Sequence, residues 1–382
     1  MMDANRTLLC VVGARPNLMK IAPVMRALRA AMPMHGIRLV HTGQHYDERM
    51  SGEHLRMLRI ADPDVNLGVG SGSHAVQTAE VMRRFEPVLD RERPAAVIVV
   101  GDVNSTLACA LVAAKKGVAV VHVEAGLRSY DRSMPEEINR VLTDQVSELL
   151  FTTESGARDN LLREGISESR IHFVGNMMID TLRDSVAVAV PPGETLRHHE
   201  VCDARCQHGY AVLTMHRPSN VDDARRLRAL LGAIGEVNRH VPVVFAMHPR
   251  TGAMVIRHGL QLLAAEACAG ILPPLGYLEM LGLLQRAKLV MTDSGGIQEE
   301  TTALGVPCLT LRENTERPVT VEQGTNTIVG CDPARIVAAA DEIVRGGGKS
   351  GRIPELWDGS ASERIASVMR RWLERGVDRL VA

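Results

Sequence analysis

The chain has 382 residues, of which 45% are apolar and 23% are charged. At roughly 150 residues per domain, this length predicts two domains, each large enough for its own core. The 44 Lys and Arg residues balance 45 Asp and Glu, and only two Trp, four Tyr and four Phe are present. This composition argues against nucleic-acid binding through a basic surface or stacked bases. No apolar run reaches the roughly 18 residues of a membrane span, and the N-terminus does not read as a signal peptide. We therefore expect a soluble cytoplasmic protein with no membrane partner.

Short apolar runs alternate with amphipathic segments along the chain, which is the pattern of βαβ units around a parallel sheet. The predicted strands of the first half are residues 8–12, 38–41, 96–100, 119–123, 149–152 and 171–174. Those of the second half are residues 211–215, 243–247, 289–292, 307–311 and 327–329. We therefore predict an α/β fold with two Rossmann-like domains that face each other across a cleft.

The predicted domain boundaries follow from the loss of this rhythm between the two series. The first domain is expected at residues 1–183, a polar linker at 184–209 and a nucleotide-binding domain at 210–361. A C-terminal helix within residues 362–382 could pack back on the first domain. The linker holds five potential metal ligands, His198, His199, Cys202, Cys206 and His208. A second ligand pair at zinc-finger spacing does not follow them, so a surface linker is favoured and no metal is expected.

Glycine, histidine, arginine and acidic residues follow the predicted strands in both halves. In open α/β sheets, ligands bind outside the carboxyl ends of the strands. The segments found there are Gly13-Ala14-Arg15, Thr42-Gly43-Gln44-His45, Gly101-Asp102, Glu124-Ala125-Gly126, His216-Arg217, His248-Pro249-Arg250 and Asp293-Ser294-Gly295-Gly296. Because loops are polar in any fold, one or two strand ends with these residue types would need no further explanation. Seven such strand ends are less easily explained in this way.

Two of these segments suit anion binding. In DSGGIQEE, residues 293–300, two glycines and a helix N-terminus would admit a phosphate, and Glu300 could accept from ribose hydroxyls. An ordinary capped helix is the alternative. In the first half, Arg15 and Lys20 place two cations near the end of the first strand. An anion site and an ordinary helix with solvated charges explain this pair equally well.

Residues 135–140, PEEINR, indicate a helix that begins with Pro135 in its first turn. We expect its buried stripe to consist of Ile138, Val141, Leu142 and Leu149. Glu136 and Arg140 would then project from the opposite side. A surface ion pair is the simpler interpretation of that pair. Asp102 and Glu124 favour instead a group of three carboxylates suited to proton transfer.

Together these motifs resemble the non-hydrolysing UDP-N-acetylglucosamine 2-epimerases. The matching segments are GARPNLMKIAPV, TGQH, GDVNSTLA, HVEAGLRS, MPEEINR, VGNMMIDT, MHRPSN, TDSGGIQEE and TERPVTVEQGTN. They run in order from residue 13 to about 326 and so cover most of the chain. The resemblance implies a fold of the glycosyltransferase-B type with a UDP-sugar in the interdomain cleft, without NAD or another cofactor and without a catalytic metal.

The resemblance also implies the reversible conversion of UDP-N-acetylglucosamine to UDP-N-acetylmannosamine. A base removes the C2 proton while UDP leaves C1, and UDP then adds back to the 2-acetamidoglucal. The implied catalytic residues are Asp102, Glu124, Glu136 and His216, and the implied substrate-binding residues are Arg15, Lys20, Arg140, Ser294, Gly295, Glu300 and Arg317. Which carboxylate serves which face of C2 stays open. A homodimer and a role in cell-surface polysaccharide biosynthesis are further expectations.

Two segments depart from the family pattern. Asn220 stands where the family commonly has Glu, and TGQH continues as Tyr46-Asp47-Glu48-Arg49-Met50, so allosteric activation through that region is not assumed. The alternatives are a variant that releases N-acetylmannosamine and UDP by hydrolysis, an epimerase of a modified UDP-sugar, a glycosyltransferase of the same fold, or a catalytically idle nucleotide-sugar-binding protein.

Overall fold

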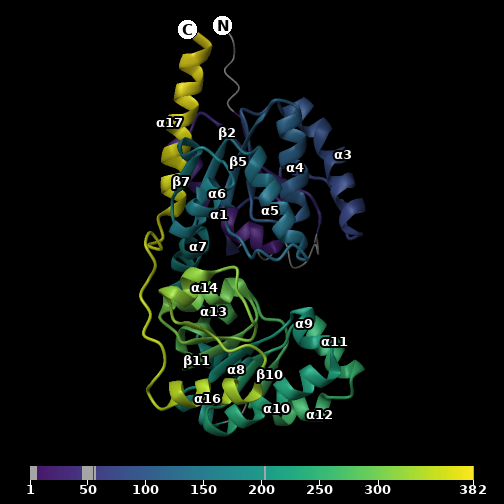
Figure 1. The fold of residues 1–382 in the computed structure, drawn as a ribbon, viewed down its shortest axis with the longest axis vertical. Coiled ribbons are helices and arrows are strands. Elements are labelled where there is room, and N and C mark those ends of the chain that lie inside the picture. The colour runs from purple at the N-terminus through teal and green to yellow at the C-terminus, as the bar shows by residue number, and fades with distance from the viewer. Residues whose placement is uncertain (1–6, 45–54, 56, 202–203, 382) are drawn as a thin grey trace. The chain divides into compact units, whose positions relative to one another are not determined.

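The computed structural model describes residues 7–44, 55, 57–201 and 204–381, apart from the side chains of Arg15 and of residues 376–381. The chain divides into two compact units (Figure 1). Unit 1 consists of Met1–Thr181 and Glu355–Ala382, and unit 2 consists of Leu182–Pro354. Each unit is built on one parallel sheet, so the expected α/β class with two Rossmann-like sheets is confirmed.

Unit 1 has a seven-stranded sheet in the order β3-β2-β1-β4-β5-β6-β7. The strands are β1 (Thr7–Val12), β2 (Gly36–His41), β3 (Val65–Asn66), β4 (Ala96–Val100), β5 (Ala119–Ala125), β6 (Leu149–Thr152) and β7 (Ile171–Phe173). Its α-helices are α1 (Arg15–Ala31), α3 (His74–Glu92), α4 (Asn104–Lys115), α5 (Pro135–Val146), α6 (Ser155–Arg163) and α17 (Ala361–Val381), while α7 (Met177–Val186) continues into unit 2. Every residue of the central strand β4 is buried, as expected for a parallel sheet covered on both faces.

The C-terminal segment returns to unit 1 and is anchored there by two polar contacts. The fully buried Trp357 donates its indole N–H to the carbonyl of Thr153, 3.0 Å away. The carboxylate of Asp180 accepts from the backbone N–H groups of Ala361 and Ser362 and so caps the start of α17. Helix α17 then packs along α1.

Unit 2 has a six-stranded sheet in the order β10-β9-β8-β11-β12-β13. The strands are β8 (Ala211–Thr214), β9 (Val243–Ala246), β10 (Gly270–Leu272), β11 (Leu289–Thr292), β12 (Cys308–Thr310) and β13 (Asn326–Ile328). Its longer helices are α10 (Ala224–His240), α11 (Pro249–Arg257), α13 (Tyr277–Arg286), α14 (Gly295–Leu304) and α16 (Pro333–Val344). Shorter helices are α8 (Pro192–His198), α9 (Pro218–Val221), α12 (Gln261–Glu266) and α15 (Pro318–Glu322).

All eleven predicted strands are present, and the structure adds β3 and β10. Both additional strands lie at the edge of a sheet and have two and three residues. The two residues of β3 are too few to show a period, and β10 begins with Gly270 and is followed by Pro273-Pro274, which favour a loop. No helix in the described part of the chain combines the length and apolarity needed to cross a membrane.

The predicted buried stripe of α5 is wrong. Ile138 and Leu142 are 42% and 44% exposed, and Leu149 belongs to β6 rather than to the helix. The buried side of α5 is polar and consists of Glu137, Asn139, Arg140, Thr143 and Asp144. Arg140 therefore points into unit 1 rather than away from its core. Partners on neighbouring loops make this burial favourable, because a buried charge is tolerated where it is paired and hydrogen-bonded.

Candidate active site

The strand order of each sheet reverses at one position, between β1 and β4 in unit 1 and between β8 and β11 in unit 2. In doubly wound sheets, ligands bind outside the carboxyl ends of the strands at such a switch point. Gly13 and Gly101-Asp102 follow β1 and β4, while His216 and Asp293 lie just beyond β8 and β11. The predicted motifs therefore lie at both switch points.

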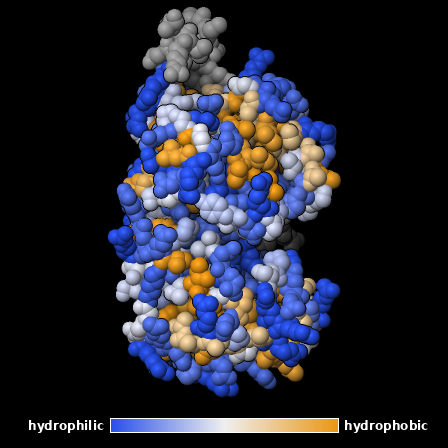
Figure 2. All heavy atoms as spheres, viewed as in Figure 1, coloured by the Kyte–Doolittle hydropathy of each residue, from blue (hydrophilic) through white to orange (hydrophobic). Residues whose placement is uncertain are grey.

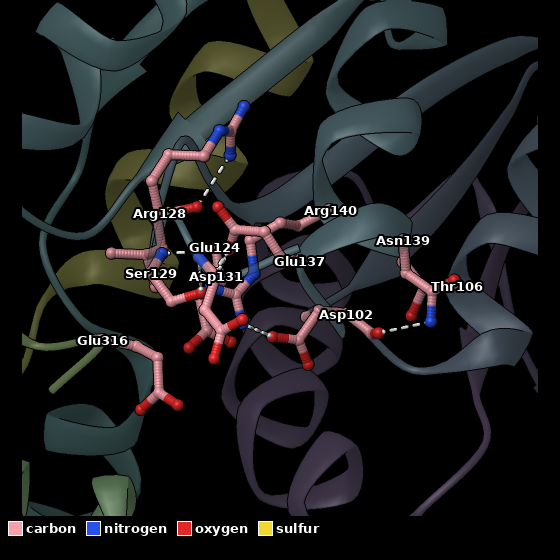
Figure 3. Close-up of polar contacts among 12 residues, drawn as sticks. Asp102, Thr106, Glu124, Arg128, Ser129, Asp131, Glu137, Asn139, Arg140 and Glu316 are labelled. Carbon is pink, nitrogen blue, oxygen red and sulfur yellow. Dashed lines mark hydrogen bonds and ion pairs between the residues drawn. The ribbon is translucent and has the colours of Figure 1, made fainter. Parts of the chain in front are cut away.

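Asp102 is held in place by two residues of α5 (Figure 3). Its carboxylate forms an ion pair with Arg140, with 2.5 Å between Oδ2 and Nη2. The side-chain amide of Asn139 donates to the backbone carbonyl of Asp102 over 2.9 Å. The Asp102 side chain remains 30% exposed, so it is fixed in position and still accessible to a ligand.

Glu124 occupies a β-bulge in β5. Its φ angle is +72°, and the pairing register of β5 with β6 shifts between Val123 and Ala125. The left-handed conformation is unfavourable for a residue with a Cβ and often marks a functional site. The buried carboxylate of Glu124 forms an ion pair with Lys20 from α1. The bulge therefore brings two predicted site residues together.

Two adjacent acids at the start of α5 have different surroundings. Glu137 is buried and accepts from the backbone N–H groups of Ser129 and Tyr130, from the Ser129 hydroxyl and from Arg140. Glu136 is half-buried and, within the described residues, has no hydrogen-bond or ion-pair partner. Glu137 therefore organises the loop that follows β5, whereas the carboxylate of Glu136 is available for a ligand. Sequence analysis did not identify the role of Glu137, although it lies in the same PEEINR motif.

His216 pairs with Asp293 at the switch point of unit 2, with 2.8 Å between Nδ1 and Oδ1. Asp293 is fully buried and also accepts from the backbone N–H groups of His216 and Arg217. Burial alone would raise the pKa of Asp293, but these hydrogen bonds and the charge of His216 hold it below its ordinary value. Sequence analysis did not assign a role to Asp293, although the residue is the second of the TDSGG motif.

The departure at Asn220 has a structural explanation. Asn220 is buried, and its side-chain amide donates to Asp293 over 3.0 Å and to the carbonyl of Leu311 over 2.9 Å. Asn220 thereby supplies a further donor to the carboxylate that holds His216. An ionised Glu at this position could only accept, so Asn220 matches its surroundings.

The N-terminus of α14 carries the predicted phosphate site. The Ser294 side chain makes no capping hydrogen bond, so it does not satisfy the first N–H groups of the helix. Among the described residues, a Cβ on Gly295 would meet only the Glu316 carboxylate, at 3.8 Å, and a Cβ on Gly296 would meet no atom within 4 Å. These two glycines therefore leave room for an anion to approach the backbone.

Five charged residues lie around this helix start: Glu299, Glu300, Arg312, Glu316 and Arg317. Arg317 donates to Glu299 over 2.6 Å, and Arg312 forms a two-bond ion pair with Glu316. Burial alone would raise the pKa of Glu316, but Arg312 and the neighbouring arginines lower it to about 2. Burial raises the pKa of Glu300 to about 7, partly offset by Tyr277. The predicted residues Ser294, Gly295, Glu300 and Arg317 thus belong to one region of unit 2.

The remaining predicted residues fall partly outside the description. Arg15 begins α1, but its side chain lies outside the described residues, as do His45 and residues 46–50. Cys202 of the predicted linker cluster also lies outside them. Among the residues that the structure describes, no group of three His, Cys, Asp or Glu side chains could hold a metal ion.

A family model described as UDP-N-acetylglucosamine 2-epimerase matches residues 28–370. A UDP-N-acetylglucosamine 2-epimerase of Methanocaldococcus jannaschii is 41% identical over 366 residues, covering 94% of this chain and 97% of that protein. A UDP-2,3-diacetamido-2,3-dideoxy-D-glucuronate 2-epimerase of Pseudomonas aeruginosa is 40% identical over 362 residues, covering 91% and 98%.

The fold is similar to solved structures with ligands bound. The crystal structure of the M. jannaschii UDP-GlcNAc 2-epimerase in complex with UDP-GlcNAc and UDP has a TM-score of 0.83 and 39% identity, covering 96% of this chain and 99% of that one. A lipopolysaccharide outer core galactosyltransferase has a TM-score of 0.52 at 13% identity, with 95% and 99% coverage, which indicates a shared fold alone.

Proposed function

The chain belongs to the UDP-N-acetylglucosamine 2-epimerase family, and we propose that it interconverts UDP-N-acetylglucosamine and UDP-N-acetylmannosamine by elimination and re-addition of UDP. The observation that carries this proposal is the pair of carboxylates at the ends of β4 and β5. Asp102 follows β4, Glu124 lies near the end of the neighbouring strand β5, and each has its own cation, Arg140 or Lys20. Carboxylates fixed in this way suit proton transfer at a carbon atom.

The proposed reaction assigns proton transfer to unit 1. One carboxylate takes the proton from C2, the electron pair forms the C1=C2 double bond, and the C1–O bond breaks with release of UDP. UDP then adds back to C1 of the 2-acetamidoglucal while C2 receives a proton on the opposite face. Asp102, Glu124 and Glu136 are the candidates for these two proton transfers. Glu136 supports the proposal because it has no competing partner within the described residues.

UDP binding is assigned to unit 2. The open N-terminus of α14 offers backbone N–H groups and the positive end of the helix dipole to a diphosphate. His216, fixed through Nδ1 by Asp293, would direct Nε2 at the departing phosphate oxygen. Arg317 and Glu300 are the proposed contacts to the rest of the nucleotide sugar.

Incubation with UDP-N-acetylglucosamine in D2O, followed by proton NMR, tests this function. We expect UDP-N-acetylmannosamine to form and deuterium to enter C2 in both epimers. Asp102→Asn should reduce the rate by ~10²-fold or more, with UDP affinity unchanged. Free N-acetylmannosamine with UDP would identify a hydrolysing variant. No change in the sugar, despite saturation with it, would refute the proposed activity.

A second substrate follows from the Pseudomonas relative, whose identity to this chain is within one percentage point of that of the M. jannaschii enzyme. The same NMR experiment with UDP-2,3-diacetamido-2,3-dideoxy-D-glucuronate compares the two sugars directly. We expect a higher kcat/KM for UDP-N-acetylglucosamine. The reverse order would assign the chain to the modified sugar while leaving the chemistry at C2 unchanged.

A homodimer formed through α5 is the proposed assembly. Ile138 and Leu142 are both more than 40% exposed and lie four residues apart, so they share one face of α5. Figure 2 shows hydrophobic surface on unit 1 in the region that Figure 1 labels α4 and α5. Sedimentation velocity should report a dimer that Ile138→Glu with Leu142→Glu dissociates. A monomeric wild-type protein would refute this assembly.

A further inference from the structure

We propose that His122 is a doubly protonated positioning residue that fixes the spacing between the Asp102 and Glu124 loops. His122 lies in β5, two residues before Glu124, and its side chain is fully buried. Neither the conversion at C2 nor UDP binding requires a direct contact with it. The proposal rests on the proposed function for its catalytic consequence, but the protonation of the ring can be measured without it.

Both ring nitrogens of His122 face hydrogen-bond acceptors. Nδ1 lies 2.6 Å from Oδ1 of Asp144, and Nε2 lies 2.9 Å from the backbone carbonyl oxygen of Gly101. A carbonyl oxygen can only accept, so Nε2 must carry a hydrogen. If Asp144 is ionised, Nδ1 must carry one as well, because a neutral ring would turn a lone pair toward one of the two oxygens.

The partners of Asp144 favour its ionised form. Its Oδ2 accepts from the backbone N–H of Gly126 over 3.1 Å and from the guanidinium of Arg128 over 2.7 Å. Arg128 is itself buried and forms a two-bond ion pair with Glu164. Glu164 is 28% exposed, whereas Arg128 and Asp144 are fully buried and form an ion pair with each other. Because two N–H donors converge on Oδ2, Asp144 is held as a carboxylate and its Oδ1 can only accept, so Nδ1 of His122 must donate to it.

The cluster connects to Asp102 and Glu124 through one or two residues of backbone. Gly101 directly precedes Asp102, so the bond from His122 fixes the start of the Asp102 loop. Gly126 follows Glu124 by two residues, so the bond to Asp144 fixes the other side of the bulge. A Cβ on Gly101 would lie 3.5 Å from Oε2 of Glu124, which shows how closely the two loops approach. A shift of about 1 Å in such a site can reduce turnover by ~10²-fold.

Two isosteric variants separate the two hydrogen bonds of His122. His122→Gln places an amide nitrogen near the position of Nε2 and keeps a donor to Gly101, whereas His122→Asn places one near Nδ1 and keeps a donor to Asp144. We expect His122→Asn to lower kcat by ~10–100-fold and His122→Gln to lower it less. The KM and the calorimetric UDP affinity should change little, because the proposed UDP site lies in unit 2. The limbs of the pH–rate profile should stay in place, since His122 exchanges no proton with the substrate.

NMR of protein labelled with 15N in its 14 histidines tests the protonation directly. At about pH 8 we expect one ring with both nitrogens protonated in the wild-type protein, and we expect His122→Gln to remove that signal. A neutral tautomer assigned to His122 would overturn the proposed charge. Equal kcat for wild type and His122→Asn would overturn the positioning role. A wild-type protein without epimerase activity would instead refute the proposed function, and the NMR result would still decide the protonation state.

Discussion

The backbone conformation of Glu124 predicts that Glu124→Gly abolishes activity and yet is more stable than Glu124→Ala. A φ of +72° costs a residue with a Cβ roughly 1–2 kcal/mol, because the left-handed conformation brings Cβ close to the following carbonyl. Glycine avoids this cost but gains about 0.4–1 kcal/mol of freedom in the unfolded chain. Glu124→Ala and Glu124→Gly both remove the partner of Lys20, so the difference between them isolates the backbone. We expect the glycine variant to be more stable by about 1 kcal/mol.

Tryptophan fluorescence during urea unfolding measures this difference in the correct unit, because both tryptophans of the chain, Trp357 and Trp372, belong to unit 1. The matched control is Glu80 within α3, where Glu80→Gly should be less stable than Glu80→Ala by about 1 kcal/mol. Both Glu124 variants should lack epimerase activity and still bind UDP. If glycine is less stable than alanine by the same amount at Glu124 and at Glu80, the bulge is not strained. That result would refute the inferred strain at Glu124.

Three further predictions test separate parts of the protein. Glu136→Gln should lower kcat by ~10²-fold without loss of stability. Glu137→Gln should lower the urea midpoint of unit 1, because Glu137 accepts from several buried donors. Equal urea midpoints for the two variants would contradict this division of roles. Gly296→Val should weaken UDP binding in calorimetry by filling the open space at the start of α14. The control is Gly232→Val on α10, where a Cβ also meets no described atom within 4 Å. This control should leave UDP binding unchanged. Burial raises the Glu300 pKa from 4.5 to about 7, so between these pH values the folded state holds a proton that the unfolded state has lost. The free energy of unfolding of unit 2 should therefore fall by up to about 3 kcal/mol as pH rises through this range. Hydrogen exchange of the β11 amides measures this fall in the wild-type protein. The Glu300→Gln variant should not show it, because its side chain does not titrate.

The central strands could be predicted because burial on both faces requires uninterrupted apolar runs. Val97 to Val100 and Leu289 to Met291 are examples, and the segments that follow them carry the predicted residues Asp102 and Ser294. Parallel strands bring all such loops to one edge of each sheet, so motif order alone predicted much of the site. The strands β3 and β10 lacked this signal because two residues show no period and because Gly270 and the Pro273-Pro274 pair favour a loop.

The prediction for α5 was wrong because periodicity assumes that apolar residues point inward. On this helix the inward side contains Glu137, Arg140 and Asp144, and each has a partner outside the helix: Tyr130, Asp102 and His122 respectively. Those partners lie in β5 and on the loops after β4 and β5, which a helical wheel does not include. The exposed Ile138 and Leu142 are the counterpart of this arrangement: the apolar face turns outward once the polar face is buried.

The two units use a similar histidine–carboxylate pair for different purposes. In unit 1, Asp144 holds Nδ1 of the fully buried His122, and the second ring nitrogen is used by the Gly101 carbonyl. In unit 2, Asp293 holds Nδ1 of His216, whose side chain is 36% exposed and whose Nε2 has no partner within the described residues. The pairing with aspartate is therefore common to a histidine that fixes a loop and to one that can meet a ligand. The two roles differ in the surroundings of Nε2. Those surroundings depend on how deeply each histidine lies at the end of its strand, and the residue type alone does not determine that depth.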